Sequence, residues 1–269
     1  MGETLFADLG EVTLAYEISG EGPRLVWCHG LGSCRVGDRD VIDALARDFT
    51  VLAYDARGHA DSPPVTDEAK YTYAAMSRDL RALLDYVGWD RAIIAGASMG
   101  AGAAVRVAME EPHRVRALIM ARPGSSGGAA DERLQLLFRL GGEAIRNGGW
   151  SAAIEFLLSI PEVNAQMAGD PTRLKMLRKE WSRHDEASIA AALIGIPASA
   201  PLTPDLDPTT ITAKVLVIPG NDPIHPRAAG EEAARIIPGA TLAPPFNGLT
   251  REDETRVFVA QIRDFVADL

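Results

Sequence analysis

Short apolar segments alternate with longer segments of helical periodicity along most of this 269-residue chain. Several of the apolar segments are almost uninterrupted runs of hydrophobic residues, which is typical of strands covered by helices on both faces. The clearest are Thr50–Asp55, Ala92–Gly96, Val115–Ala121 and Lys214–Pro219. This order predicts an α/β fold, with a mostly parallel central sheet of about eight strands and helices on both of its faces.

The segments between these strands show apolar residues at helical intervals. Helices are predicted at Met76–Val87, Gly100–Glu110, Arg227–Ile237 and Glu252–Leu269. Near the N-terminus, the alternating segment Val12–Ser19 precedes a turn sequence that leads into the apolar segment Leu25–Cys28. We expect these two segments to form an antiparallel hairpin.

The stretch from Pro123 to about Asp207 interrupts this alternation, because it begins with glycines and serines and ends in a proline-rich segment. Between these ends lie the amphipathic segments Leu134–Ile145, Ala152–Leu158 and Leu174–Ile194. We interpret residues 123–207 as a helical cap at the carboxyl edge of the sheet, and residues 1–122 and 208–269 as the core domain. The alternative is that these helices only pack on the core.

The charge of the chain limits the partners that it can bind. The formal net charge is −10 and basic residues do not cluster, whereas nucleic acids and anionic membranes are bound through groups of Lys and Arg. No apolar run approaches the length of about 20 residues that spans a bilayer, and no signal-peptide pattern is visible. We therefore expect a cytoplasmic monomer or homodimer that binds neither nucleic acid nor membranes.

Cys28 and Cys34 are the two cysteines of the chain. Two ligands are too few for a zinc site, and in a cytosolic protein such a pair favours free thiols over a disulfide. The sequence therefore predicts no metal site.

The segment Gly96-Ala97-Ser98-Met99-Gly100 matches the pattern G-x-S-x-G, and it stands between a predicted strand and a predicted helix of small residues. In this context the pattern forms a tight strand-to-helix turn that lifts the serine hydroxyl out of the sheet. The N-terminus of the helix offers amide groups and the positive end of its dipole to a developing oxyanion. Ser98 is therefore the candidate nucleophile.

Two other loops resemble those of the α/β-hydrolase fold family. His29-Gly30-Leu31-Gly32 follows a predicted strand, as the oxyanion-hole loop of that family does. The segment from Asp55 to Ser62 resembles the family's D-x-R-G-H-G-x-S loop and departs from it at Ala60.

This resemblance implies a role for several residues. The backbone amides of Met99 and Leu31 would bind the oxyanion, with the adjacent Gly32 as an alternative to Leu31, in the loop that Gly30 opens. The side chains of His29 and His59 would shape these loops through hydrogen bonds rather than act as bases.

A third loop, from Pro219 to Pro226, follows a strong predicted strand and resembles the family's G-x-x-D-x-x-x-P. By this resemblance Asp222 would be the acid that accepts a hydrogen bond from an imidazole and fixes its tautomer. The alternative is an aspartate that only forms the turn and caps the next helix.

The histidine that this family carries between its last strand and final helix is missing. The family pattern is G-H-x-x-x-x-E, and in the matching segment, from Gly248 to Glu254, Leu249 occupies the histidine position. The five histidines lie elsewhere, at positions 29, 59, 113, 184 and 225. A serine hydroxyl without a base is a poor nucleophile at neutral pH, so the source of the base decides the activity.

Three explanations are open. His225 could supply the base from the acid loop itself, three residues after Asp222. The fold could instead carry a non-hydrolytic reaction, such as a cyclisation or a lyase step, in which Ser98 only orients the substrate. Finally, the histidine could have been lost, naturally or by engineering, leaving a catalytically impaired pseudohydrolase. In the predicted cap, Trp181 and His184 are candidate substrate contacts, and His184 is also a candidate base; a surface position is the alternative.

The leading hypothesis is a serine hydrolase that acts on a small-molecule substrate. It would cleave an ester, thioester or lactone of a small, largely apolar molecule through an acyl-enzyme on Ser98, with Asp222 and His225 as the proton relay. No cofactor is implied. The alternatives are the non-hydrolytic enzyme and the pseudohydrolase.

Overall fold

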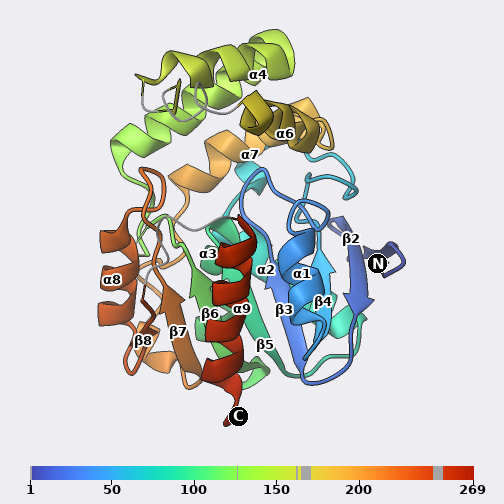
Figure 1. Ribbon diagram of the computed structural model, residues 1–269, viewed down its shortest axis with the longest axis vertical. Helices are drawn as coiled ribbons and strands as arrows, with labels where there is room; N and C mark the ends of the chain where they lie inside the picture. The colour runs from blue at the N-terminus through green and yellow to red at the C-terminus, as the bar shows by residue number, and fades with distance from the viewer. Residues whose placement is uncertain (1, 126, 162, 165–170, 245–250) are drawn as a thin grey trace.

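The computed structural model describes residues 2–125, 127–161, 163–164, 171–244 and 251–269. Within these residues, eight strands form one sheet in the order β1-β2-β4-β3-β5-β6-β7-β8 (Figure 1). The strands are β1 (Leu5–Asp8), β2 (Thr13–Ser19), β3 (Arg24–Cys28), β4 (Thr50–Tyr54), β5 (Ala92–Ala97), β6 (Val115–Ala121), β7 (Lys214–Ile218) and β8 (Thr241–Leu242). Strands β1, β2 and β4 pair antiparallel, and all pairs from β4 to β8 are parallel. The predicted fold class is confirmed.

The predicted hairpin between Val12–Ser19 and Leu25–Cys28 is wrong, because β4 lies between β2 and β3. The connecting loop passes around the end of β4 instead of turning back. Gly20 and Gly22 both have positive φ, and a Cβ on Gly20 would lie 2.2 Å from the carbonyl oxygen of Ala46. This close approach to the segment before β4 requires glycine, and it leaves β3 free to pair in parallel with β4 and β5.

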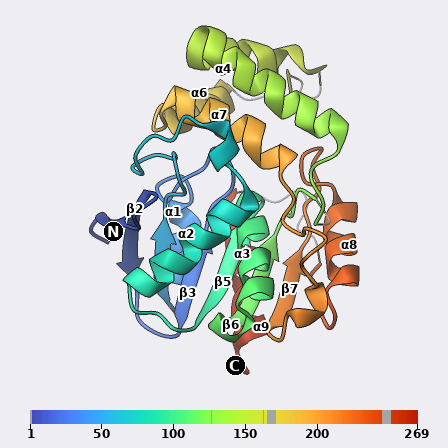
Figure 2. The same cartoon turned by 180° about the vertical axis from the view of Figure 1, so that it is seen from behind.

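Helices cover both faces of the sheet (Figures 1 and 2). Helices α1 (Arg39–Leu45) and α9 (Arg251–Val266) pack on one face, while α2 (Tyr73–Tyr86), α3 (Met99–Glu110) and α8 (Arg227–Ile236) pack on the other. Successive residues of a strand point to opposite faces, so in β3 Leu25 and Trp27 contribute to the core under α1 and α9. Val26 and Cys28 contribute to the core on the α2 and α3 side.

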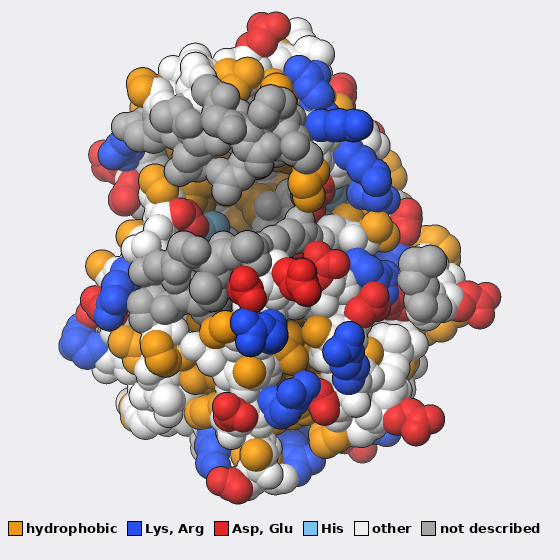
Figure 3. Space-filling model, in the orientation of Figure 1, with side chains coloured by type: hydrophobic (Ala, Val, Ile, Leu, Met, Phe, Trp, Pro, Cys, Tyr) orange, Lys and Arg blue, Asp and Glu red, His pale blue; other side chains and the backbone are white. Residues whose placement is uncertain are grey.

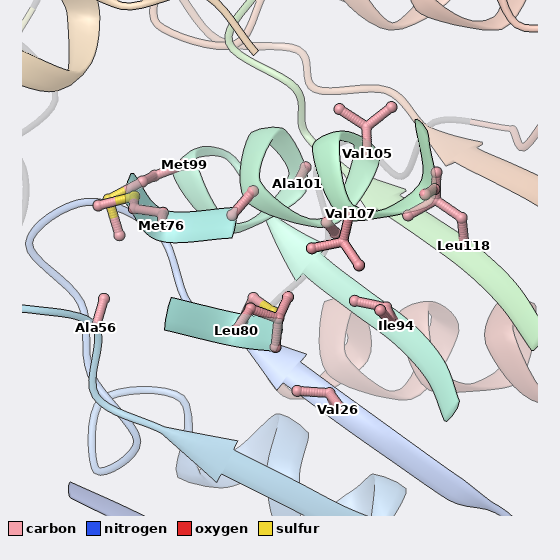
Figure 4. Packing of buried hydrophobic residues seen from close by; sticks show 14 of the residues in the cluster. Val26, Ala56, Met76, Leu80, Ile94, Met99, Ala101, Val105, Val107 and Leu118 are labelled. Carbon is pink, nitrogen blue, oxygen red and sulfur yellow. The ribbon is translucent and has the colours of Figure 1, made fainter. Parts of the chain in front are cut away.

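Helix α3 lies close to the sheet because its first turns are built from glycine and alanine. Ala101, Ala104 and Ala108 are completely buried. Figure 4 shows Ala101, Val105 and Val107 of this helix beside apolar side chains of the neighbouring strands, including Ile94 and Leu118. The packing fixes the start of α3, and with it the position of Ser98.

Helices α4 (Glu132–Ser159), α6 (Pro171–Trp181) and α7 (Glu186–Ala198) lie above the carboxyl ends of the parallel strands (Figures 1 and 2). We call these helices the helical layer. In α4, Gly148 and Gly149 have non-helical backbone angles, so the helices predicted at Leu134–Ile145 and Ala152–Leu158 join across a kink.

The single helix predicted at Leu174–Ile194 is interrupted, which places His184 in a turn between α6 and α7. Asp185 begins α7 by accepting a hydrogen bond from the amide of Ser188 at 2.8 Å. None of the described helices combines the length and apolar character needed to span a membrane. The division of the chain into a core domain and a cap stays a prediction.

Candidate active site

Ser98 stands at the bend between β5 and α3, at the carboxyl end of the sheet. Its backbone angles, φ 51° and ψ −112°, lie in a region that non-glycine residues rarely adopt. The amide of Ser98 donates to the carbonyl of Ala121 at 2.9 Å, which ties the bend to β6. The strained turn leaves the side chain of Ser98 half-buried beside a cavity.

Two glycines make this bend possible. A Cβ on Gly96 would lie 2.4 Å from the backbone of Gly100, and a Cβ on Gly100 would lie 2.1 Å from the carbonyl oxygen of Cys28. Both distances are far below van der Waals contact. Any larger residue at either position would therefore push α3 away from the sheet.

His225 lies within hydrogen-bond distance of both Ser98 and Asp222. Its Nε2 is 2.9 Å from Ser98 Oγ, and its Nδ1 is 3.1 Å and 3.0 Å from the two carboxylate oxygens of Asp222. Because an ionised carboxylate can only accept, Nδ1 carries the proton and Nε2 accepts from the serine hydroxyl. The structure thus brings the three predicted catalytic residues together, although two of them share one loop.

The acid loop can aim both side chains because it is a tight turn. Asp222 Oδ1 accepts from the amides of Ile224 and His225, each at 2.9 Å. A Cβ on Gly220 would lie 2.3 Å from the carbonyl oxygen of His225, so the loop folds directly onto its own start. Asp222 therefore forms the turn and also bonds the imidazole. The sequence had offered these two roles as alternatives.

The surroundings of Asp222 favour its ionised form. Burial alone would raise the pKa of this carboxyl. Hydrogen bonds and the charge interaction with His225, together with the backbone amides, outweigh burial and lower the pKa to about 2. The carboxylate is charged at neutral pH and can stabilise an imidazolium.

Backbone amides suited to an oxyanion surround Ser98. Among the described residues, neither the amide of Leu31 nor that of Met99 has a hydrogen-bond acceptor, and Met99 opens α3, where amides lack helical partners. The amide of Gly32 instead donates to His59 Nε2 at 3.3 Å. A Cβ on Gly30 would lie 3.5 Å from Ser98 Cβ, so this loop passes close to the serine. The resemblance offered the amide of Leu31 or that of Gly32 as the second oxyanion donor, beside Met99. Because the amide of Gly32 is already bonded, the geometry favours Leu31.

Three buried histidines lie behind this loop. The ring centroids of His29 and His59 are 5.1 Å apart, and those of His59 and His184 are 5.6 Å apart. His29 Nε2 accepts from the amide of Ala56 at 2.9 Å, and His184 Nδ1 accepts from that of Ala60 at 3.0 Å. Burial holds the pKa of His59 well below its usual value, and the neighbouring histidines lower it further. The hydrogen bonds of these side chains hold the loops, and none of them is made with Ser98.

A cavity of about 380 Å³ opens beside Ser98. Figure 3 shows this face hollowed between the helical layer and the sheet below it. Apolar side chains from several elements form most of the wall: Trp27, Leu31, Val41, Phe138, Ile224 and Phe258. Polar groups include Asp38, whose oxygens accept from Trp27 Nε1 at 2.8 Å and Ser33 Oγ at 2.7 Å.

Sequence reasoning missed most of this wall. Arg122 directly follows β6, has φ 45°, and pairs with Glu254 of α9 at 3.0 Å. Phe138 comes from α4 of the helical layer. No local pattern marks such residues, because only the packing of the helices brings them to Ser98.

Trp181 and His184 are not among the described residues that line the cavities at Ser98. Trp181 packs against Trp150, with ring centroids 5.2 Å apart, and His184 is buried against the loop at Ala60. Their predicted contact with substrate does not fit this geometry. The vacant histidine position, Leu249, lies outside the described residues.

The sheet order, the strained serine and the neighbouring histidine and carboxylate are typical of α/β proteins that carry a serine on a strand-to-helix turn. Residues 23–242 match the family model of the alpha/beta hydrolase fold. The chain therefore belongs to the α/β-hydrolase fold family.

Solved structures and curated relatives agree with this assignment. An enol-lactonase from Burkholderia xenovorans superposes with a TM-score of 0.82 at 25% identity, covering 98% of this chain and all of that one. A thermophilic esterase from Thermogutta terrifontis gives a TM-score of 0.80 at 24% identity, with 98% of each chain covered, and this likeness shows the fold alone.

The curated relatives match over part of their length. A fluoroacetate dehalogenase from Burkholderia sp. is 33% identical over 119 residues, which is 43% of this chain and 39% of that protein. An uncharacterized protein of Mycobacterium tuberculosis is 34% identical over 126 residues, 47% of this chain and 35% of that protein. These matches cover too little of either protein to carry an activity or a substrate across to this chain.

Proposed function

We propose that this protein is a serine hydrolase that cleaves an ester, thioester or lactone of a small, largely apolar molecule through an acyl-enzyme on Ser98. The observation that carries the proposal is the chain of contacts from Ser98 Oγ to His225 Nε2 at 2.9 Å, and from Nδ1 to Asp222 at 3.0 Å. A base within this distance of a serine hydroxyl supplies what the leucine at position 249 cannot. The apolar wall of the adjacent cavity supports a largely apolar substrate.

In the first half of the reaction, Ser98 Oγ attacks the carbonyl carbon while His225 Nε2 takes the hydroxyl proton. The amides of Leu31 and Met99 donate to the oxyanion of the tetrahedral intermediate. The charge of Asp222 stabilises the imidazolium that has formed. When the bond from the carbonyl carbon to the leaving oxygen, or to the leaving sulfur of a thioester, breaks, the imidazolium returns the proton to that departing atom.

In the second half, water attacks the acyl-enzyme. His225 takes a proton from this water and returns it to Ser98 Oγ as the acid product leaves. The net change is the addition of one water across the ester bond, and no cofactor enters the scheme.

The experiment that tests the proposal is hydrolysis of p-nitrophenyl acetate by the protein and by the variants Ser98→Ala and His225→Gln. We expect each variant to lower kcat/KM on the order of 10³-fold or more, because the nucleophile and its base act as a unit. His113→Gln is the matched control, since His113 is exposed in the 3₁₀ turn Pro112–Arg114, at the opposite end of α3 from Ser98.

Two other outcomes would contradict the proposal. Turnover that persists in His225→Gln would exclude this residue as the base. If wild-type protein showed no hydrolysis that depends on Ser98, the non-hydrolytic enzyme or the pseudohydrolase would be the better description.

A further inference from the structure

Ser98 lies where separate cavities meet. Besides the wide cavity of about 380 Å³, a narrow cavity of about 50 Å³ reaches Ser98 on the side of Tyr73. A third space of about 20 Å³ continues from it beneath Leu202. Leu31, Phe138 and Ile224 border both the wide and the narrow cavity, so these apolar side chains form the partition between them.

The position of His225 distinguishes the wide cavity from the narrow one. This histidine lines the wide cavity and is absent from the described walls of the narrow one. A general acid has to reach the leaving oxygen within about 3 Å. The tetrahedral intermediate therefore has to direct its leaving group toward the wide cavity, and the acyl chain then points to the other side of Ser98.

The size of the narrow cavity limits the acyl chain. A water-sized group needs on the order of 10–15 Å³ of cavity volume, so a cavity of about 50 Å³ holds only a few such groups. Part of its wall is formed by Leu134, Ile196 and Pro197 of the helical layer. Ile196 is only 3% exposed, so its side chain is held in place by the packing around it.

Tyr73 also lines the narrow cavity and packs against α3. A Cβ on Gly102 would lie 2.2 Å from the ring of Tyr73, so the ring rests directly on the helix backbone and cannot retreat. The amide of Tyr73 also donates to Ser199 Oγ at 3.1 Å, which ties the start of α2 to the end of α7. These contacts hold the Tyr73 wall in place and limit the room for longer chains on that side of the narrow cavity.

We propose that the substrate is an acyclic ester or thioester with a short apolar acyl group, of about two to four carbons, bound on the Tyr73 side of Ser98. The bulkier alcohol or thiol part occupies the wide cavity between the start of α1 and the start of α9. This assignment rests on the proposed function and adds which cavity binds each half of the substrate.

The test compares two series of esters on the wild-type protein. Along p-nitrophenyl acetate, butanoate, hexanoate and octanoate, kcat/KM should fall about tenfold or more between butanoate and hexanoate, because extra methylenes overfill the narrow cavity. Along phenyl acetate and 1-naphthyl acetate, kcat/KM should hold or rise, because the larger alcohol has room.

Two truncations separate the cavities. Leu134→Ala, on the narrow side, should raise the hexanoate-to-butanoate ratio of kcat/KM about tenfold. Val41→Ala, on the wide side, should leave that ratio unchanged. Both side chains are half-buried, so neither truncation opens the central core.

The outcomes distinguish a failure of the cavity assignment from a failure of the proposed function. If hydrolysis depends on Ser98 but octanoate is preferred and naphthyl acetate is refused, the assignment of the cavities is overturned and the serine hydrolase stands. If no ester of either series is hydrolysed in a Ser98-dependent manner, both proposals fail.

Discussion

His184, which is buried in the turn between α6 and α7, allows a quantitative test of the structure. His184 is 6% exposed, and its Nδ1 accepts a hydrogen bond from the amide of Ala60 at 3.0 Å. Its Nε2 is buried as well. Burial, with a smaller contribution from the neighbouring His29, lowers the pKa of His184 from 6.5 to about 4.

The sign of the effect follows from this lowered pKa. Between pH about 6.5 and about 4 the unfolded chain binds a proton at His184 that the folded chain does not. The stability that neutral His184 contributes is therefore complete above pH 6.5 and is lost as the pH falls toward 4. The difference between these two pKa values corresponds to about 3 kcal/mol of unfolding free energy.

His184→Asn removes the titration and keeps an acceptor for the amide of Ala60. Urea unfolding of the wild type and of this variant, at pH values from 7 to 4, measures the free energy of unfolding of each. We expect the wild type to lose about 3 kcal/mol more than the variant over this range. His113→Asn, at an exposed site, serves as the control. Parallel curves for wild type and His184→Asn would refute the burial that the structure assigns to this side chain.

Three other substitutions test local features. Gly58 has φ 65°, and a Cβ there would lie 1.9 Å from the hydroxyl of Tyr71, so Gly58→Ala should lower the free energy of urea unfolding by about 2–4 kcal/mol. Ala60 has φ 43°, and Ala60→Gly should raise the thermal midpoint slightly, since relief of about 1–2 kcal/mol exceeds the added unfolded-state entropy. Asp222→Asn should lower kcat/KM for p-nitrophenyl acetate on the order of 10³-fold or more at pH 7 while circular dichroism stays unchanged.

The sequence was sufficient for the sheet and the serine turn because both depend on local signals. Continuous apolar runs mark strands that are buried on both faces, and the small residues around Ser98 belong to one short motif that can be read in the sequence. The place of β2 depends instead on how the chain passes residues 46–49, which no local pattern reveals. The hairpin prediction failed for that reason.

The base could not be chosen from the sequence because the direction of His225 is set by a turn. Asp222 folds the loop by accepting two backbone amides, and Gly220 allows the loop to close on itself. The motif shows which residues are present but not where an imidazole within it points. The walls of the cavities are harder still to foresee, since Phe138 and Phe258 reach them from helices that meet only in the folded chain.

The central claim is that His225 activates Ser98, and the rate of covalent modification by a fluorophosphonate probe tests it most directly. Intact-protein mass spectrometry should show one adduct per chain, located by peptide mapping on Ser98 and absent from Ser98→Ala. Labelling of His225→Gln should be slower on the order of 10³-fold. An adduct on another residue, or equal rates for the wild type and His225→Gln, would contradict the account.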